Sequence, residues 1–124
     1  MNKLATILLT AVLVAFGANT LSAQTSTAPK SVIHVVTVKW KTDATTNQIQ
    51  AALDGVKALP AAYPGITRVW IKSIKVQGDK ANAIEMEFAD EAALKAYTDS
   101  PAQKEWYKLY MPIREESTTF DITN

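Results

Sequence analysis

The sequence predicts an α+β fold in which four strands and two helical regions follow one another in the order βαββαβ. Two observations carry this prediction. Segments rich in β-branched or alternating residues are typical of strands, and segments with apolar residues three and four apart are typical of helices. The length of 124 residues gives room for one domain.

The first predicted strand, residues 31–41, is rich in β-branched residues and contains neither Gly nor Pro. Alternate side chains of a strand point to opposite faces. One face is apolar along its length and consists of Val32, His34, Val36, Val38 and Trp40. The other face is apolar only in its first half and consists of Ile33, Val35, Thr37, Lys39 and Lys41. A strand that is apolar on both faces is usually covered on both.

The first helix is predicted to follow a polar segment at residues 43–46. Thr45 and Gln48 have the spacing of a capping box, in which two side chains satisfy free backbone donors reciprocally. The apolar stripe of this helix consists of Ile49, Ala52, Leu53, Val56 and Leu59. Pro60 is predicted to end the helix, and residues 63–65 (YPG) are predicted to form a turn.

The second and third strands are predicted at residues 66–76 and 81–88, with a hairpin connection at residues 77–80. Residues 117–123 are the predicted fourth strand.

The second helical region lies between the third and fourth strands. Asp90 is predicted to cap it, and Ser100-Pro101 to restart it, because proline is tolerated in a first helical turn. Its apolar side consists of Ala93, Leu94, Tyr97, Trp106, Leu109 and Tyr110, and it ends before Pro112.

This order of elements is that of the ferredoxin-like fold, an antiparallel sheet with both helical regions on one face. The helices can bury only one face of the sheet, so Ile33 and Val35 on the other face need a cover that this chain does not supply. A second copy, related by a two-fold axis, is the economical cover. We therefore predict a homodimer with the architecture of a dimeric α+β barrel.

Residues 1–23 have the pattern of a cleavable secretory signal peptide. Lys3 gives a positive start, residues 4–17 form an uncharged apolar run, and Ala23 is a small residue at the expected cleavage site. The run is shorter than the about 20 apolar residues of a membrane span, which argues against a transmembrane anchor. We predict an exported protein, periplasmic or secreted, with a flexible leader at residues 24–30 and a folded domain at residues 31–124.

Composition excludes several classes of function. The chain has no cysteine, so it has no disulfide and no thiol for a lipoprotein anchor. Loss of Lys3 with the signal lowers the 13 Lys and Arg residues to 12, which equals the 12 Asp and Glu residues. A domain without net charge lacks the excess of Lys and Arg that binds nucleic acid or acidic membrane, so neither partner is expected. His34 is the single histidine, and we expect neither a metal site nor a cofactor.

Several segments, taken in order, resemble the stress-responsive A/B-barrel (Dabb) family. These segments are His34–Lys41, Leu59-Pro60 with Pro64–Ile66, Glu87-Phe88, Leu94 with Ala96-Tyr97, and Ser100–Ala102. The resemblance covers residues 32–122 and rests on the order and spacing of the motifs together. It implies a homodimeric α+β barrel and, from the family's name, a role in a stress response.

The family's best-understood chemistry is that of the plant polyketide cyclase that makes olivetolic acid, to which this chain bears a distant resemblance. There two histidines and a nearby tyrosine serve a cyclising aldol condensation. The resemblance places the first histidine at His34, the tyrosine at Tyr97 and the second histidine at Gln103. Because glutamine does not exchange a proton near neutral pH, we expect no two-histidine mechanism and no cyclase activity.

The candidate residues allow two interpretations. His34 is either a general base at the mouth of a pocket or a structural histidine bonded to a helix residue such as Tyr97. Tyr97 and Trp106 either stack on a flat ligand or fill the core. The first hypothesis is a binding site for a small apolar or aromatic molecule, formed by His34, Tyr97, Gln103 and Trp106. The alternative is a cyclase- or monooxygenase-like enzyme with His34 as general base.

Glu85 and Glu87 share one face of a predicted strand and resemble a catalytic carboxylate pair. We instead expect them to form cross-strand ion pairs with Lys39 and Lys41, because the first and third strands are neighbours in a ferredoxin-like sheet.

Overall fold

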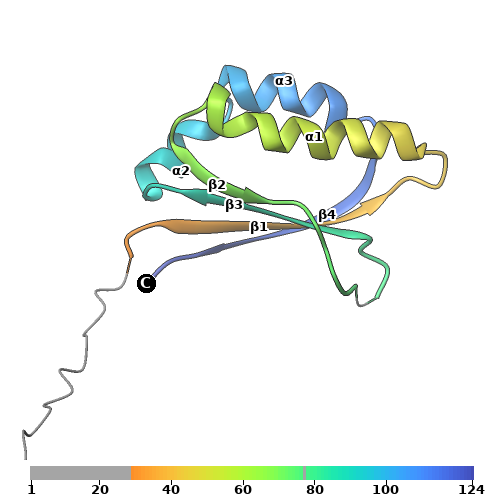
Figure 1. The fold of residues 1–124 in the computed structure, drawn as a ribbon, viewed down its shortest axis with the longest axis horizontal. Helices are drawn as coiled ribbons and strands as arrows, with labels where there is room; N and C mark the ends of the chain where they lie inside the picture. Colours follow the sequence, from red (N-terminus) through yellow and green to blue (C-terminus); the bar gives the residue numbers. More distant parts are fainter. Residues whose placement is uncertain (1–28, 77) are drawn as a thin grey trace, which may run out of the picture.

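The computed structural model describes residues 29–76 and 78–124 (Figure 1). The predicted signal peptide, residues 1–23, and most of the predicted leader lie outside these residues. In the described part of the chain, no helix has the length and apolar character needed to cross a membrane.

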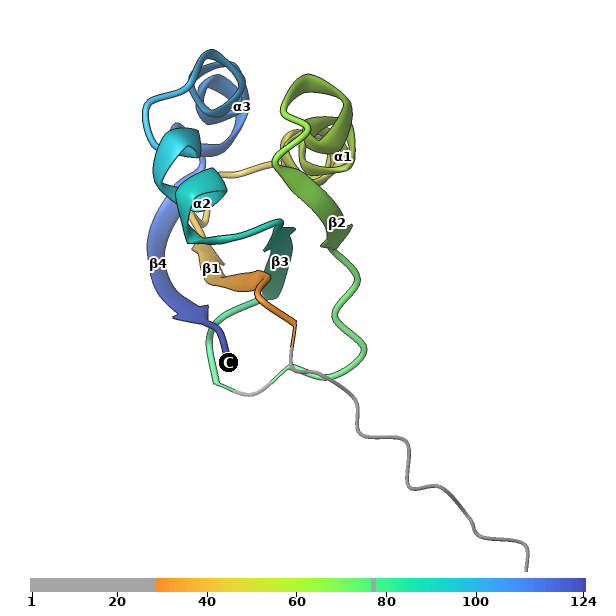
Figure 2. The same cartoon turned by 90° about the vertical axis from the view of Figure 1, so that its left-hand side faces the viewer.

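Within the described residues, the chain forms four strands and three helices. They are β1 (Val32–Trp40), α1 (Thr46–Ala62), β2 (Ile66–Trp70), β3 (Asn82–Phe88), α2 (Glu91–Tyr97), α3 (Pro101–Tyr110) and β4 (Arg114–Ile122). The strands pair antiparallel in the order β2-β3-β1-β4. All helices lie on one face of the sheet and leave the other face bare (Figure 1 and Figure 2). The predicted ferredoxin-like βαββαβ fold is confirmed.

Helix α1 begins where the sequence predicted but ends later. The Thr45 hydroxyl accepts the N–H of Gln48, and the Gln48 side chain accepts the N–H of Thr45 at 2.9 Å, which completes the capping box. The prediction that Pro60 ends the helix was wrong, since the helix continues to Ala62. Pro60 lacks an N–H and its ring crowds the preceding turn, but both effects act on the N-terminal side of the proline, and Tyr63 still donates its N–H to Leu59 in the last turn at 2.7 Å.

The second helical region is divided at Asp99, which has a φ of 63°. This left-handed conformation interrupts a helix and is tolerated by aspartate more readily than by most residues. Ser100 caps α3 by accepting the N–H of Gln103, and Pro101 occupies the first turn. The side-chain oxygen Oε1 of Gln103 in turn accepts the N–H of Asp99 at 2.7 Å. The turn between α2 and α3 therefore holds the Gln103 side chain in place.

Two strand boundaries differ from the prediction. Strand β2 ends at Trp70 and not at residue 76, and Ile74 in the following segment is 94% exposed. There the Ser73 hydroxyl, rather than a strand carbonyl, accepts the N–H of Ala83 at 2.9 Å. Strand β4 begins at Arg114, three residues before the predicted start, because Arg114 still pairs with the end of β1.

The core lies between the sheet and the helices, on the face of β1 that the sequence predicted to be covered. The fully buried side chains of largest volume are Phe88, Ile66, Ile84, Met86, Val38 and Val56. Four of the five residues on this face of β1 are buried, namely Val32, Val36, Val38 and Trp40. The fifth, His34, is partly exposed.

The opposite, outer face of the sheet carries an apolar patch formed by Ile33, Val35, Phe120 and Ile122. Strand pairing sets Ile33 beside Ile122 and Val35 beside Phe120. Phe120 and Ile122 are 58% and 57% exposed, values that are high for large apolar side chains. Nothing within the described chain covers this outer patch.

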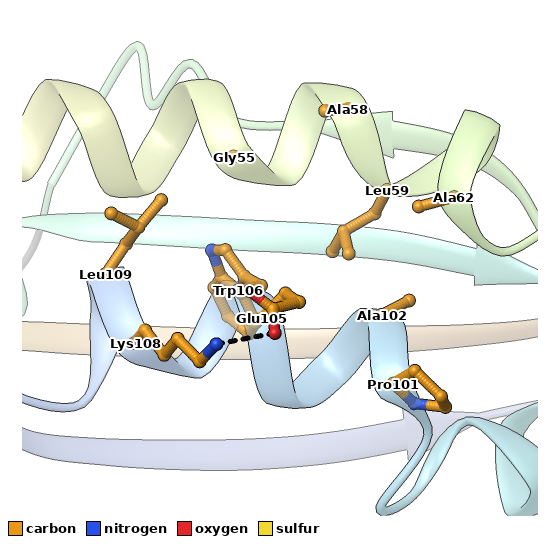
Figure 3. A pocket seen from close by; sticks show the side chains of 10 residues that line it. All are labelled: Gly55, Ala58, Leu59, Ala62, Pro101, Ala102, Glu105, Trp106, Lys108 and Leu109. Atoms are coloured by element: carbon orange, nitrogen blue, oxygen red, sulfur yellow. Dashed lines mark hydrogen bonds and ion pairs between the residues drawn. The ribbon is translucent and has the colours of Figure 1, made fainter.

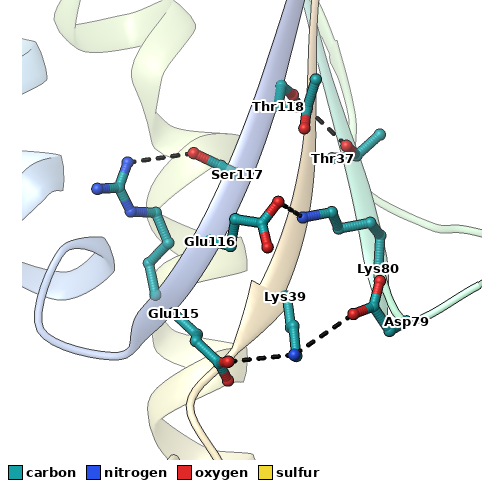
Figure 4. Close-up of polar contacts among 9 residues, drawn as sticks. Thr37, Lys39, Asp79, Lys80, Glu115, Glu116, Ser117 and Thr118 are labelled. Carbon is teal, nitrogen blue, oxygen red and sulfur yellow. Dashed lines mark hydrogen bonds and ion pairs between the residues drawn. The ribbon is translucent and has the colours of Figure 1, made fainter.

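The predicted ion pairs between Glu85 or Glu87 and Lys39 or Lys41 are wrong. In the antiparallel register, Glu85 and Glu87 lie opposite Val35 and Ile33 in the first half of β1, whereas Lys39 lies near its end and Lys41 just after it. The charges that do form pairs are shown in part in Figure 4: Lys39 with Glu115 and Asp79, and Lys80 with Glu116.

Glu87 pairs instead with Arg68 of β2. The hydrogen bond from Arg68 is the main reason that the pKa of Glu87 falls to about 2, against the opposing effect of burial. The carboxylate therefore has a structural partner and remains ionised, which leaves no basis for a catalytic carboxylate pair.

Candidate functional site

A cavity of about 250 Å³ lies between the sheet and the α2–α3 region, and we call it the His34 cavity. All the binding residues predicted from the sequence contribute to its lining: His34, Tyr97, Gln103 and Trp106. Residues far apart in the chain thus meet at one place, because β1 supplies the histidine and the two short helices supply the others.

The His34 imidazole is fixed by a carboxylate. Its Nδ1 lies 2.5 Å from Oδ1 of Asp121, the residue that pairs with it across β1 and β4. An ionised carboxylate only accepts hydrogen bonds, so Nδ1 donates its hydrogen, and in the neutral imidazole Nε2 is then an acceptor. The edge of the ring also contacts Phe88, with centroids 5.9 Å apart. The expected structural partner, Tyr97, is not the residue that binds this imidazole.

Tyr97 is buried among other aromatic rings, and its hydroxyl is left without a hydrogen bond in the described part of the chain. The ring packs against Phe88 and Tyr63, with centroid distances of 5.3 and 5.4 Å. The hydroxyl oxygen is buried and has no hydrogen-bond partner among the described residues. Burial raises the pKa of Tyr97, so the hydroxyl stays protonated and can donate a hydrogen bond.

Gln103 offers hydrogen-bond donors to the cavity, whereas Trp106 offers the surface of its ring. The side-chain oxygen of Gln103 is engaged by Asp99, which leaves its amide N–H groups as the available donors. The indole N–H of Trp106 donates to the Ala52 carbonyl of α1 at 3.0 Å. Its ring stacks on Tyr110, with centroids 4.6 Å apart and an interplanar angle of 13°. Trp106 is therefore both a core residue and an apolar wall of the cavity.

Comparison with known families identifies the chain. A family model described as Stress Responsive A/B Barrel Domain (Dabb) matches residues 32–124. The chain belongs to the Dabb family. The family resemblance inferred from the sequence motifs is thereby confirmed.

Solved structures share the Dabb fold. A hydroxynitrile lyase from Passiflora edulis is 20% identical with a TM-score of 0.69, covering 77% of this chain and 94% of that chain. A Dabb family protein from Mesorhizobium loti is 24% identical with a TM-score of 0.64, covering 76% and 96%. A dimeric ferredoxin-like protein of unknown function from Thermobifida fusca is 16% identical with a TM-score of 0.66, covering 77% and 92%. A comparison with curated proteins found no match.

Strand β4 of this Dabb domain supplies site residues that the sequence prediction missed. Ser117, Thr119 and Asp121 pair with Val38, Val36 and His34 of β1. Paired residues of neighbouring antiparallel strands share a face, so these three polar side chains point toward the helices. The alternation in residues 114–122 (REESTTFDI) contains the signal, but only the strand register shows that its polar side faces inward.

A larger hollow lies elsewhere on this Dabb domain, between α1 and α3 (Figure 3). It has a volume of about 610 Å³ and is lined mainly by small and apolar side chains, including Gly55, Ala58 and Leu109. Glu105 and Lys108, its charged residues, pair with each other at 2.5 Å. The smaller His34 cavity holds the titratable and unpartnered polar groups, so it is the better candidate site.

Metal-binding chemistry has no support in the described residues, where no group of three or more His, Cys, Asp or Glu side chains could hold a metal ion.

Proposed function

We propose that this Dabb protein is exported and binds a small aromatic or apolar molecule in the His34 cavity, without catalysis. The observation that carries the proposal is a pair of buried hydroxyls, those of Tyr97 and Tyr110, which have no partner among the described residues. Both side chains line the cavity. Buried polar groups are normally hydrogen-bonded, so these hydroxyls favour an occupant that bonds to them.

The size and walls of the cavity support a one-ring molecule. Its volume of about 250 Å³ is just below the roughly 300–1,000 Å³ that is usual for drug-sized ligands. The rings of Tyr97, Trp106 and Tyr110 offer aromatic surface for offset or edge contacts. His34 Nε2 and the Gln103 amide add directional hydrogen bonds.

Replacing His34 with Ala should weaken binding of a one-ring probe that bonds to the imidazole by about 1–3 kcal/mol, because one hydrogen bond is lost. The fold should change little, since Asp121 is half exposed and keeps water as a partner. We would titrate phenol, benzyl alcohol and benzoate and follow amide shifts by NMR.

Two further variants locate the binding. Thr119→Trp should fill the exposed side of the cavity lining and abolish the shifts. Lys104→Trp adds the same ring on the exposed surface of α3, away from the cavity, and should leave them unchanged. Shifts that persist in Thr119→Trp, or a panel that gives none in the unmodified protein, would contradict the proposal.

The His34–Asp121 pair favours a second candidate function. A carboxylate on Nδ1 orients a histidine and leaves Nε2 ready to accept a proton, as in many acid–base sites. A cyclase- or monooxygenase-like enzyme would use His34 as its general base, and the Passiflora edulis hydroxynitrile lyase shows that an enzyme can share this fold. Turnover of a polyketide substrate by the unmodified chain would favour this candidate.

We also propose that the protein is a homodimer in which the outer patches of two copies face each other. The patch is apolar, and in one chain its Phe120 and Ile122 side chains are more than half exposed. The Thermobifida fusca structure, which shares the fold, is described as dimeric, and this supports the same assembly here.

Export rests on the sequence of residues 1–23. Replacing Leu9 with Arg should trap the full-length precursor inside the cell, because a charge in the apolar run disables the signal. Fractionation and mass spectrometry would measure this. Asn2→Arg, which adds the same charge to the basic start, should still be exported. Export of the Leu9 variant with cleavage near Ala23 would show that the segment is not a signal peptide of this kind.

A further inference from the structure

We propose that the ligand of the His34 cavity is an acid, a one-ring molecule whose carboxylate binds Arg114. This inference rests on the proposed function and narrows it to a chemical class. Arg114 is the first residue of β4 and pairs with Trp40 of β1, whose side chain is buried beneath the helices. Its side chain lines the same cavity as His34.

Arg114 is a cation without a counter-charge in the described part of the protein. Its Nη1 donates to the Ser117 hydroxyl at 3.1 Å, and its guanidinium lies 5.8 Å from the centroid of the Tyr110 ring. The Nε atom is buried and has no partner among the described residues. The adjacent carboxylates of Glu115 and Glu116 pair with Lys39 and Lys80. Arg114 as a whole is only partly exposed, and a buried N–H without a partner is costly, so this position favours an anion that bonds to Nε.

The part of the guanidinium that lacks a partner among the described residues matches a carboxylate, which would reach Nε after a small shift of the side chain. Ser117 occupies Nη1, which leaves the edge formed by Nε and Nη2. That edge presents two parallel N–H groups, the geometry with which arginine holds a carboxylate through two hydrogen bonds. A neutral amide or alcohol cannot give the same pair of charge-assisted bonds.

The rest of the cavity is rich in donors and poor in negative charge. Tyr97 stays protonated because burial raises its pKa, and Gln103 has only its amide N–H groups available. The carboxylate of β4 that lies on the helix side of the sheet is that of Asp121, and it binds His34 at the other end of the strand from Arg114. Asp121 lies seven positions along the strand from Arg114, so their backbones are roughly 20 Å apart. An acid can therefore approach Arg114 without meeting Asp121.

Matched acid and amide probes test the inference. Benzoate and phenylacetate would be titrated against benzamide and phenylacetamide by calorimetry. We expect the unmodified protein to bind each acid about ten-fold or more tightly than its amide, as charge-assisted hydrogen bonds predict. Arg114→Gln should abolish this preference and still bind the amides. Lys104→Gln, which removes the same charge from the exposed surface of α3, should keep it.

Arg114→Lys provides a second test that retains the charge. Lysine is a point charge without the planar fork, so the preference for acids should fall but not vanish. Equal binding of acids and amides by the unmodified protein, or an undiminished preference in both Arg114 variants, would overturn this inference and leave the proposed function standing. Failure of all four probes to bind would count against the proposed function and the inference together.

Discussion

Replacing Val35 with Asp is expected to convert the protein into a folded monomer or an unfolded chain. Val35 lies in the middle of the outer patch, beside Phe120 of β4 and opposite Glu85 of β3. In one isolated chain this position is only half-buried, so a carboxylate there can remain hydrated. In a dimer formed through this face the same carboxylate would lose its water.

The expected cost is large because burial of even a neutral polar group without a partner costs about 2–7 kcal/mol, and a charge costs more. The neighbouring Glu85 carboxylate adds repulsion across the strands. Sedimentation over a range of concentrations would measure the change in association. A stable, folded dimer of the Val35→Asp protein would show that the outer patch is not the interface.

Two further variants distinguish loss of the interface from repulsion by Glu85 and from general destabilisation. Val35→Lys removes the repulsion from Glu85 but still places a charge on the patch, so it should also dissociate the dimer. Ala51→Asp adds a carboxylate to the exposed surface of α1, in the helical layer, and should leave the assembly unchanged. Loss of the dimer in Ala51→Asp would point to general destabilisation and not to a specific interface.

Local sequence signals predicted most of the fold because they act within a few residues. The alternation of β1, the capping box at Thr45 and Ser100-Pro101 each set an element through nearby hydrogen bonds and side-chain packing. The predictions were wrong where a contact depends on residues that are far apart in the sequence. Lys39 pairs with Glu115 because of the register between β1 and β4, and with Asp79 because of the path of the β2–β3 connection, and no local pattern contains either.

The candidate site was predicted only in part, for the same reason. Family resemblance led to His34, Tyr97 and Gln103, and the structure brings these residues to one cavity. Asp121 and Arg114 were missed because their role depends on which side of β4 faces the helices. In most half-buried strands the apolar side faces the core, but in β4 the polar side lines the cavity.

The unusual orientation of β4 links the proposed dimer to the proposed site. The same alternation that points Thr119 and Asp121 toward the cavity sends Phe120 and Ile122 to the outer face. A slip of one residue would exchange the two sets of side chains. Cover of the outer patch by a second copy would therefore help to hold the register that keeps Asp121 beside His34.

Phe88 is expected to be the core residue on which the His34 end of the cavity most depends. It is fully buried at the end of β3, and its ring contacts His34, Tyr63 and Tyr97. Removal of the ring leaves a void that these three neighbours can fill only by moving away from their present positions.

Replacing Phe88 with Ala should therefore lower the free energy of unfolding by about 3–5 kcal/mol, the usual cost of deleting a buried phenyl group. Ligand binding should weaken as well, because His34 and Tyr97 lose the ring that orients them. Urea unfolding at a fixed, high protein concentration would measure the first effect, so that dissociation does not add to it. Phe88→Leu keeps most of the volume and should cost less. A loss below about 1 kcal/mol for the alanine variant would mean that the surrounding rings close the void and that Phe88 does not position His34.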